Sequence, residues 1–158
     1  MDERFCEAVT PHGVRSLDTR KYFAVVRQTL HDSGRAHVRV TGMSMWPLLR
    51  HMRDGVVIVP PVRVRAGDIV LYERGNGRYA LHRVIRVRSN RFDMAGDHER
   101  FVERDLDTGR VMGVAQQVER GRRRVSCQSF PLRAYALLMT LRGRALMLLR
   151  GARPGERG

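Results

Sequence analysis

The sequence has almost no lysine. Of its 30 basic residues, 29 are arginine and Lys21 is the single exception. Any chemistry that needs a lysine side chain is therefore excluded downstream of residue 21. The chain has 158 residues, of which 42% are apolar and 29% charged. These values are typical of one compact folded domain, not of a disordered or collagenous chain.

Cysteines and long apolar runs are also scarce. Cys6 and Cys127 form no CxxC pair, so two reduced thiols are expected, with a disulfide as the alternative. The N-terminus begins with acidic residues and lacks the apolar run of a secretory signal. The most apolar segment, residues 130–150, is interrupted by three arginines, whereas a membrane span needs about 20 mostly apolar residues. We therefore expect a cytoplasmic protein without signal peptide or transmembrane span, for which peripheral attachment to a membrane stays open.

Acidic residues number only 16, which leaves a formal net charge of +14. Residues 118–158 contain 10 basic and 2 acidic residues and so carry +8 of this charge. A charge concentrated in this way indicates either an anionic partner or the solvated surface of an arginine-rich chain.

Hydrophobic periodicity predicts a mainly β fold with one helix on each side in the sequence. Apolar residues recur at helical spacing between about Thr19 and Gly34, and a glycine there is placed to end an amphipathic helix. From residue 36 the period changes to two, and Asn76-Gly77 marks a hairpin turn. Strands are expected near residues 38–40, 56–59, 69–72, 79–87, 92–95, 110–118 and 123–127, followed by a basic helix over 132–150 that Gly143 weakens.

The most specific segment of the chain is a serine in a glycine-containing turn, Val40-Thr41-Gly42-Met43-Ser44-Met45-Trp46-Pro47. A serine becomes a nucleophile only beside a base, and the attacked carbonyl needs preorganised N–H donors. Five motifs in order then resemble the signal peptidase superfamily, which includes the self-cleaving repressor peptidases. They are GMSMWP, VRAGDIVLYE, LHRVIRV, MAGDHE and GRVMGVA, within roughly residues 36–118.

The resemblance implies an all-β serine peptidase core with Ser44 as nucleophile. Family members use either lysine or histidine as base; no lysine follows Ser44, and His82 stands at the matching place, so the resemblance is to the histidine type. An imidazole ordinarily titrates near ~6.5 and can act as a base without strong burial. For the acid that orients the imidazole, Asp97 is our first candidate and Asp105 the second, with Glu103 as a further alternative. The oxyanion would rely on backbone amides around Ser44 and Gly42, where bacterial signal peptidases have a serine at the position of Gly42.

Two functions remain open at this stage. The first is a serine endopeptidase that cleaves a leader or precursor peptide, with residues 1–35 as a helical lead, 36–118 as catalytic core and 119–158 as a strand plus basic helix. The second is a non-catalytic peptide-binding or scaffold module of the same fold. We expect no metal and no cofactor, a peptide or protein substrate, and contact with an anionic membrane rather than a nucleic acid, because the positive charge lies mostly outside the core. Met43, Met45 and Trp46 could line a substrate groove or belong to the core.

Overall fold

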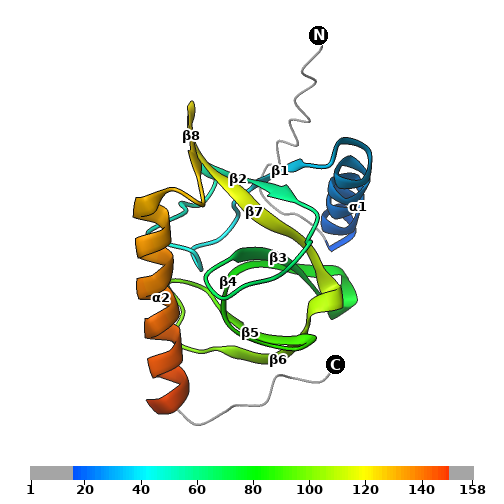
Figure 1. Cartoon of the computed structure of the whole chain (residues 1–158). Helices are drawn as coiled ribbons and strands as arrows, with labels where there is room; N and C mark the ends of the chain where they lie inside the picture. Colours follow the sequence, from blue (N-terminus) through cyan, green and yellow to red (C-terminus); the bar gives the residue numbers. More distant parts are fainter. Residues whose placement is uncertain (1–15, 150–158) are drawn as a thin grey trace.

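A computed structural model of the chain describes residues 16–149. Eight strands form one sheet, and a helix stands on either side of it (Figure 1). The elements are α1 (Ser16–Ser33), β1 (Ala36–Arg39), β2 (Asp54–Val59), β3 (Ile69–Arg74), η1 (Gly75–Gly77), β4 (Arg78–Arg88), β5 (Arg91–Ala95), β6 (Glu103–Asp107), η2 (Thr108–Arg110), β7 (Val111–Arg120), β8 (Arg123–Ser126) and α2 (Phe130–Leu149).

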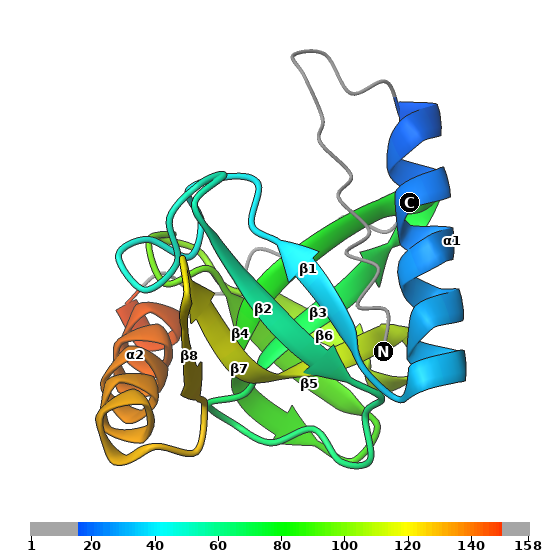
Figure 2. The same cartoon turned by 90° about the horizontal axis from the view of Figure 1, so that it is seen from above.

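The sheet is antiparallel throughout and strongly coiled, as the two views in Figures 1 and 2 show. Its strand order is β1-β2-β7-β3-β4-β5-β6, and β8 pairs with β7. The predicted mainly β class is therefore confirmed. One strand, β6, was not predicted, because its sequence Glu-Arg-Asp-Leu-Asp has a single apolar residue and carries no strand signal of its own.

The coiled sheet encloses two groups of buried apolar side chains. One lies between α1, β1, β2 and the segment after β1, and includes Val26, Leu30 and Leu49. The other lies inside the curve of β3, β4, β5 and β7, and includes Val70, Val84 and Phe92. Because β4 contributes to the second group with one face and meets α2 with the other, its central residues are buried on both sides.

Local signals explain how α1 and the β3–β4 hairpin end. Gly34 adopts φ +68°, and its N–H donates to the carbonyl of Leu30 (3.0 Å), which closes the C-terminus of α1. The hairpin has a three-residue connection, Gly75–Gly77, with Arg74 paired to Arg78. The predicted turn is thus in the expected place but one residue longer than an Asn-Gly turn.

The C-terminal helix α2 packs across β4, and no helix within residues 16–149 is long and apolar enough to cross a membrane. Cys127 is a free thiol near its start, and burial raises the pKa of this thiol to about 11. Cys6 and the acidic N-terminal segment lie outside the described residues.

Candidate active site

Ser44 lies in the long connection between β1 and β2, and the loop after β5 holds it in place. The backbone N–H of His98 donates to the Ser44 carbonyl (2.8 Å), and the His98 ring meets the Trp46 ring edge to face, with centroids 5.2 Å apart. Gly96 comes closer still: a Cβ atom at this residue would lie 2.6 Å from the Ser44 carbonyl oxygen and 2.9 Å from the Ser44 Cβ. The serine turn and residues 96–99 are therefore one packed unit.

His82 lies in the middle of β4, opposite Val70 of β3, and only 3% of its surface is exposed. Strand alternation puts it on the same face as Ala80 and Val84, which belong to the apolar group inside the curved sheet. A buried imidazole on such a face needs polar partners, because an unpaired polar group costs about 1–3 kcal/mol there.

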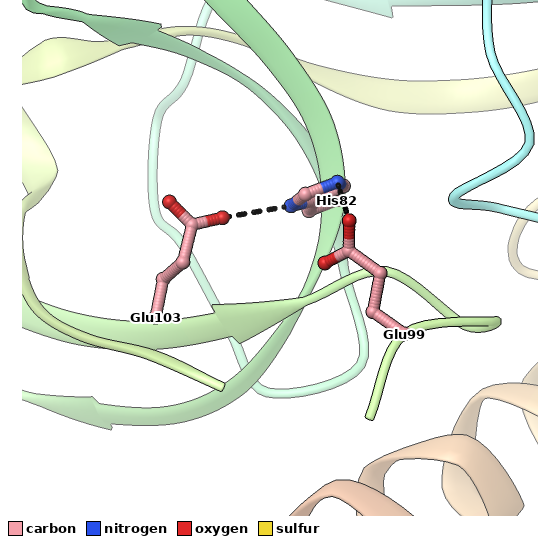
Figure 3. Close-up of side chains that lie close together, drawn as sticks. All are labelled: His82, Glu99 and Glu103. Atoms are coloured by element: carbon pink, nitrogen blue, oxygen red, sulfur yellow. Dashed lines mark hydrogen bonds and ion pairs between the residues drawn. The ribbon is translucent and has the colours of Figure 1, made fainter. Parts of the chain in front are cut away.

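Glu103 of β6 is the first of these partners (Figure 3). Its Oε1 lies 3.0 Å from His82 Nδ1, and Arg74 at the end of β3 donates to both carboxylate oxygens, with Nε 3.1 Å from Oε2. Burial alone would raise the pKa of Glu103, but the hydrogen bonds from His82 and Arg74 outweigh it and lower this pKa below its ordinary value. The carboxyl group is thus charged at neutral pH and can only accept, so the hydrogen of this contact belongs to His82 Nδ1.

The same shift has a consequence for stability. Because the folded-state pKa of Glu103 is lowered, the group stabilises the fold at pH values above the ordinary carboxyl pKa. This contribution is lost as the pH falls through the lowered value.

Glu99 is the second partner and lies at the opposite side of the ring (Figure 3). Its Oε1 is 3.6 Å from His82 Nε2, and its Oε2 accepts from the Gly96 N–H (3.3 Å). A Cβ at Gly96 would be 3.0 Å from the Glu99 carboxyl carbon and 2.9 Å from Ser44 Cβ. Gly96 therefore lies close to both Ser44 and Glu99, and within residues 16–149 the Ser44 hydroxyl makes no hydrogen bond to the imidazole.

Asp97, our first candidate for the orienting acid, does not contact His82. It makes two hydrogen bonds with Arg83, Nε to Oδ1 at 2.7 Å and NH2 to Oδ2 at 2.8 Å, and both side chains are buried. Since Arg83 follows His82 directly on β4, its side chain points to the opposite face of the sheet, toward α2. The assignment of Asp97 is corrected for this reason: it belongs to the other side of the strand.

Asp105, the second candidate, is an exposed residue of β6 and also fails to reach the imidazole. It adopts φ +57°, and its backbone N–H donates to Asp93 (3.0 Å). Regular strand alternation would put Asp105 on the face of Glu103, but the left-handed residue interrupts the alternation. Of the acids considered from the sequence, Glu103 alone contacts His82 within the part of the chain that the structure describes.

The two backbone amides expected to hold an oxyanion are in different states. The Gly42 N–H donates to His51 Nδ1 (2.8 Å) and is already engaged, in a backbone conformation with φ +115° that suits glycine. The Ser44 N–H, in contrast, donates to no acceptor among residues 16–149. The structure therefore favours Ser44 over Gly42 as an oxyanion donor, and it gives His51 the role of fixing the turn.

Three potential metal-ligand atoms, from His82, Glu99 and Glu103, lie within 4.8 Å of one another. The two carboxylates, however, approach different nitrogens of the imidazole, so one ion cannot use both carboxylates and either nitrogen without a rearrangement. Glu103 is also neutralised by Arg74. A cation at this site would have His82 Nε2 and Glu99 as its ligands, with Glu103 orienting the ring from the other side.

The apolar residues around Ser44 divide between surface and core. Met43 and Trp46 are 53% and 42% exposed, whereas Met45 is buried in the group between α1, β1 and β2. A further exposed aromatic residue, Phe101, lies between the two glutamates in the sequence and is 58% exposed. Met43 and Trp46 are thus free to contact a bound chain beside Ser44, and Met45 is a core residue.

Sequence reasoning did not single out Arg74, Glu99 or Gly96 for a role in the site. The first is the last residue of β3 before the hairpin, and the other two lie in the MAGDHE motif, where attention falls on the aspartate. Comparison of the chain with protein-family models, with curated proteins and with solved structures finds no match in any of the three. The interpretation of the site therefore rests on the motifs and on this geometry.

Proposed function

We propose that the protein is a serine peptidase of the signal-peptidase type, with Ser44 as nucleophile and His82 as general base. The observation that carries the proposal is the arrangement around His82: a buried imidazole is held at Nδ1 by a charged glutamate, and its Nε2 faces Glu99, which accepts from Gly96, the residue packed against Ser44. This is the base-and-orienter pair that activates a serine in unrelated folds.

The chemistry follows from this arrangement once a substrate displaces the Glu99 carboxylate from Nε2. Ser44 Oγ attacks the scissile carbonyl, and its proton passes to His82 Nε2. The negative oxygen that forms accepts a hydrogen bond from the Ser44 N–H. His82 then gives the proton to the leaving amine, and an acyl-enzyme ester remains on Ser44. A water deprotonated by His82 attacks this ester, the bond between Ser44 Oγ and the acyl carbon breaks, and His82 returns the proton to Ser44 Oγ. Glu103 stays ionised and stabilises the imidazolium in both steps.

The substrate class that suits this fold is an extended peptide, such as the leader of a precursor. Within the described residues β1 pairs only with β2, and its other edge has no strand partner although α1 packs against this strand; β1 leads directly into the Ser44 turn. Exposed Met43 and Trp46 lie next to the nucleophile and would contact the side chains that flank the cleaved bond.

One observation favours the second candidate, a peptide-binding module without catalysis. The group that lies next to His82 Nε2 is the Glu99 carboxylate and not the Ser44 hydroxyl. If the carboxylate stayed there when a peptide binds, His82 could not take a proton from Ser44, and the site would only bind.

Labelling by a serine-directed covalent probe tests the proposal. The wild-type protein is expected to be labelled at Ser44, and Ser44→Ala and His82→Ala are expected to lose the label. Ser33→Ala and His31→Ala, at exposed positions on or next to the end of α1, are the matched controls and should be labelled like wild type. If wild type and all four variants were labelled equally and negligibly, the protein would be a peptide-binding module without catalysis.

A chelator separates the serine mechanism from a metal-dependent one at the same residues. Cleavage of a peptide found by mass spectrometry in a peptide library should survive treatment with EDTA. Loss of cleavage that added Zn²⁺ restores would contradict the assignment of Ser44.

Gly96→Ala probes the contact between the Ser44 turn and residues 96–99. The new methyl group would meet the Ser44 backbone at 2.6 Å, so one segment must move away from the other. Because a displacement of about 1 Å in a reacting group can cost about 10²-fold, we expect kcat/KM to fall by roughly that factor. Gly109→Ala is the control: its Cβ would meet only the exposed side chain of Asp107, at 3.3 Å. Unchanged kinetics in both variants would show that the Ser44 turn takes no part in the reaction.

A further inference from the structure

Helix α2 buries Thr140 and Gly143 against the protein, while six of its large apolar residues are exposed. On the inner side, a Cβ at Gly143 would lie 2.5 Å from Ile85 Cδ1, and Gly67 approaches Ala136 and Thr140. The outer side carries Phe130, Leu137, Leu138, Leu141, Leu148 and Leu149, which are 52–87% exposed. With the exposed Ala134 and Ala145 they follow a 3–4 residue period along the whole helix, so they form one stripe.

Polar contacts hold α2 in this orientation. Arg142 donates to the Asp97 carbonyl (3.0 Å), Arg104 donates to the Met147 carbonyl (3.3 Å), and Arg144 Nε donates to the Ile85 carbonyl (3.4 Å). The Tyr135 ring lies against the Arg83 guanidinium at 5.5 Å. The inner face is therefore the one that fits the protein, and the outward position of the leucines is a fixed property of the fold.

A single exposed leucine is common on a protein surface and needs no explanation. An exposed apolar stripe along a whole helix does need one. A 20-residue helix is about 30 Å long, and apolar patches of such extent mark surfaces that meet another apolar phase. Figures 1 and 2 show α2 on the outside of the molecule, and among residues 16–149 no other helix or strand lies over its outer side.

The charges beside the stripe identify the kind of partner. Residues 120–149 contain seven arginines and no aspartate or glutamate. Arg133 and Arg144 are exposed on α2 itself, where Arg144 Nε also donates to the Ile85 carbonyl (3.4 Å), and Arg122 and Arg123 are exposed on the β7–β8 hairpin that precedes α2 in the chain. A second copy of the chain would bring arginine against arginine here, whereas an anionic bilayer offers both an apolar interior and negative headgroups.

We infer that the outer face of α2 binds the surface of an anionic membrane. The helix lies in the plane of the interface, with its leucines among the acyl chains and its arginines at the headgroups. This inference does not depend on the peptidase proposal, since neither Ser44 nor His82 lies on α2. If both hold, the enzyme acts on precursors at a membrane surface.

Co-sedimentation of the full chain with lipid vesicles tests the inference. The protein should bind vesicles of phosphatidylcholine mixed with phosphatidylglycerol, bind much less to phosphatidylcholine alone, and dissociate as salt is added. The double variant Leu137→Gln/Leu141→Gln keeps good helix formers on the outer face and is expected to lose at least about tenfold in vesicle affinity. Val25→Gln, at an exposed position of α1, is the control and should bind like wild type.

A second variant checks the electrostatic part. Arg133→Gln/Arg144→Gln should weaken binding to anionic vesicles by about fivefold for each charge and leave the weak binding to neutral vesicles unchanged. Circular dichroism confirms that the variants keep their fold. Absence of wild-type binding to either vesicle would overturn the inference. So would a wild-type dimer in solution that Leu137→Gln/Leu141→Gln makes monomeric, because the face would then be an interface between copies.

Discussion

Glu103→Gln is expected to lower kcat for peptide cleavage by about 10⁴-fold, the size of effect known when the orienting acid of a serine triad becomes an amide. The glutamine retains the shape of the side chain, but it can present an N–H₂ group to His82 Nδ1 where the carboxylate accepts a hydrogen bond at 3.0 Å. The imidazole then places its hydrogen on Nε2 and cannot take a proton from Ser44. The charge that stabilises the imidazolium is lost at the same time.

The kinetic readouts distinguish this positioning role from a loss of fold. KM should change little, since Glu103 does not contact the peptide, and Glu103→Asp should recover part of kcat because it restores the charge. Glu73→Gln on β3 is the matched control: this glutamate binds Arg27 at the surface (2.7 Å), remote from the imidazole, and its amide variant should keep wild-type kcat. If Glu103→Gln retained wild-type kcat with an unchanged pH profile, His82 would not be the base.

The sequence was sufficient to predict the mainly β class and the positions of seven of the eight strands, because most of those strands carry short apolar runs or alternating apolar residues. It was also sufficient to place the hairpin, since glycines next to an asparagine mark turns. It could not predict β6. That strand is stabilised by pairing with β5, and two of its residues, Arg104 and Asp105, are not buried.

Asp97 was chosen from the sequence because it matches the Gly-Asp pair of the signal-peptidase resemblance. Glu103 and Asp105 were alternatives in a segment for which no strand was predicted. In the structure the chain turns back at residues 99–102, and register places Glu103 opposite Met94 on β5, next to the strand of His82. At Gly143, too, the sequence alone shows only part of the effect. An isolated glycine weakens a helix, but here the glycine lets α2 approach Ile85 closely enough to pack.

Asp97→Ala is expected to lower the free energy of unfolding by about 3–5 kcal/mol, because it removes one partner of a buried ion pair and leaves the other unneutralised. Arg83 would keep only the Gly67 carbonyl as a hydrogen-bond acceptor, at 2.8 Å. Urea denaturation measures the change. The control is Glu73→Ala, which breaks the exposed pair with Arg27 and should cost at most about 1 kcal/mol.

A second variant, Asp97→Asn, tests what the Gly-Asp pair of the MAGDHE motif does. Asp97 binds Arg83 on β4 through its side chain and Arg142 of α2 through its carbonyl, while its neighbours Gly96 and His98 contact Ser44. It is thus the point at which the serine turn, the strand of the base and the C-terminal helix are joined. If this is its whole role, Asp97→Asn should be less stable than wild type and yet have the wild-type dependence of kcat on pH at temperatures where it is folded. If Asp97→Asn instead had unchanged stability and a shifted pH profile, then Asp97, and not Glu103, would be the acid that acts with His82.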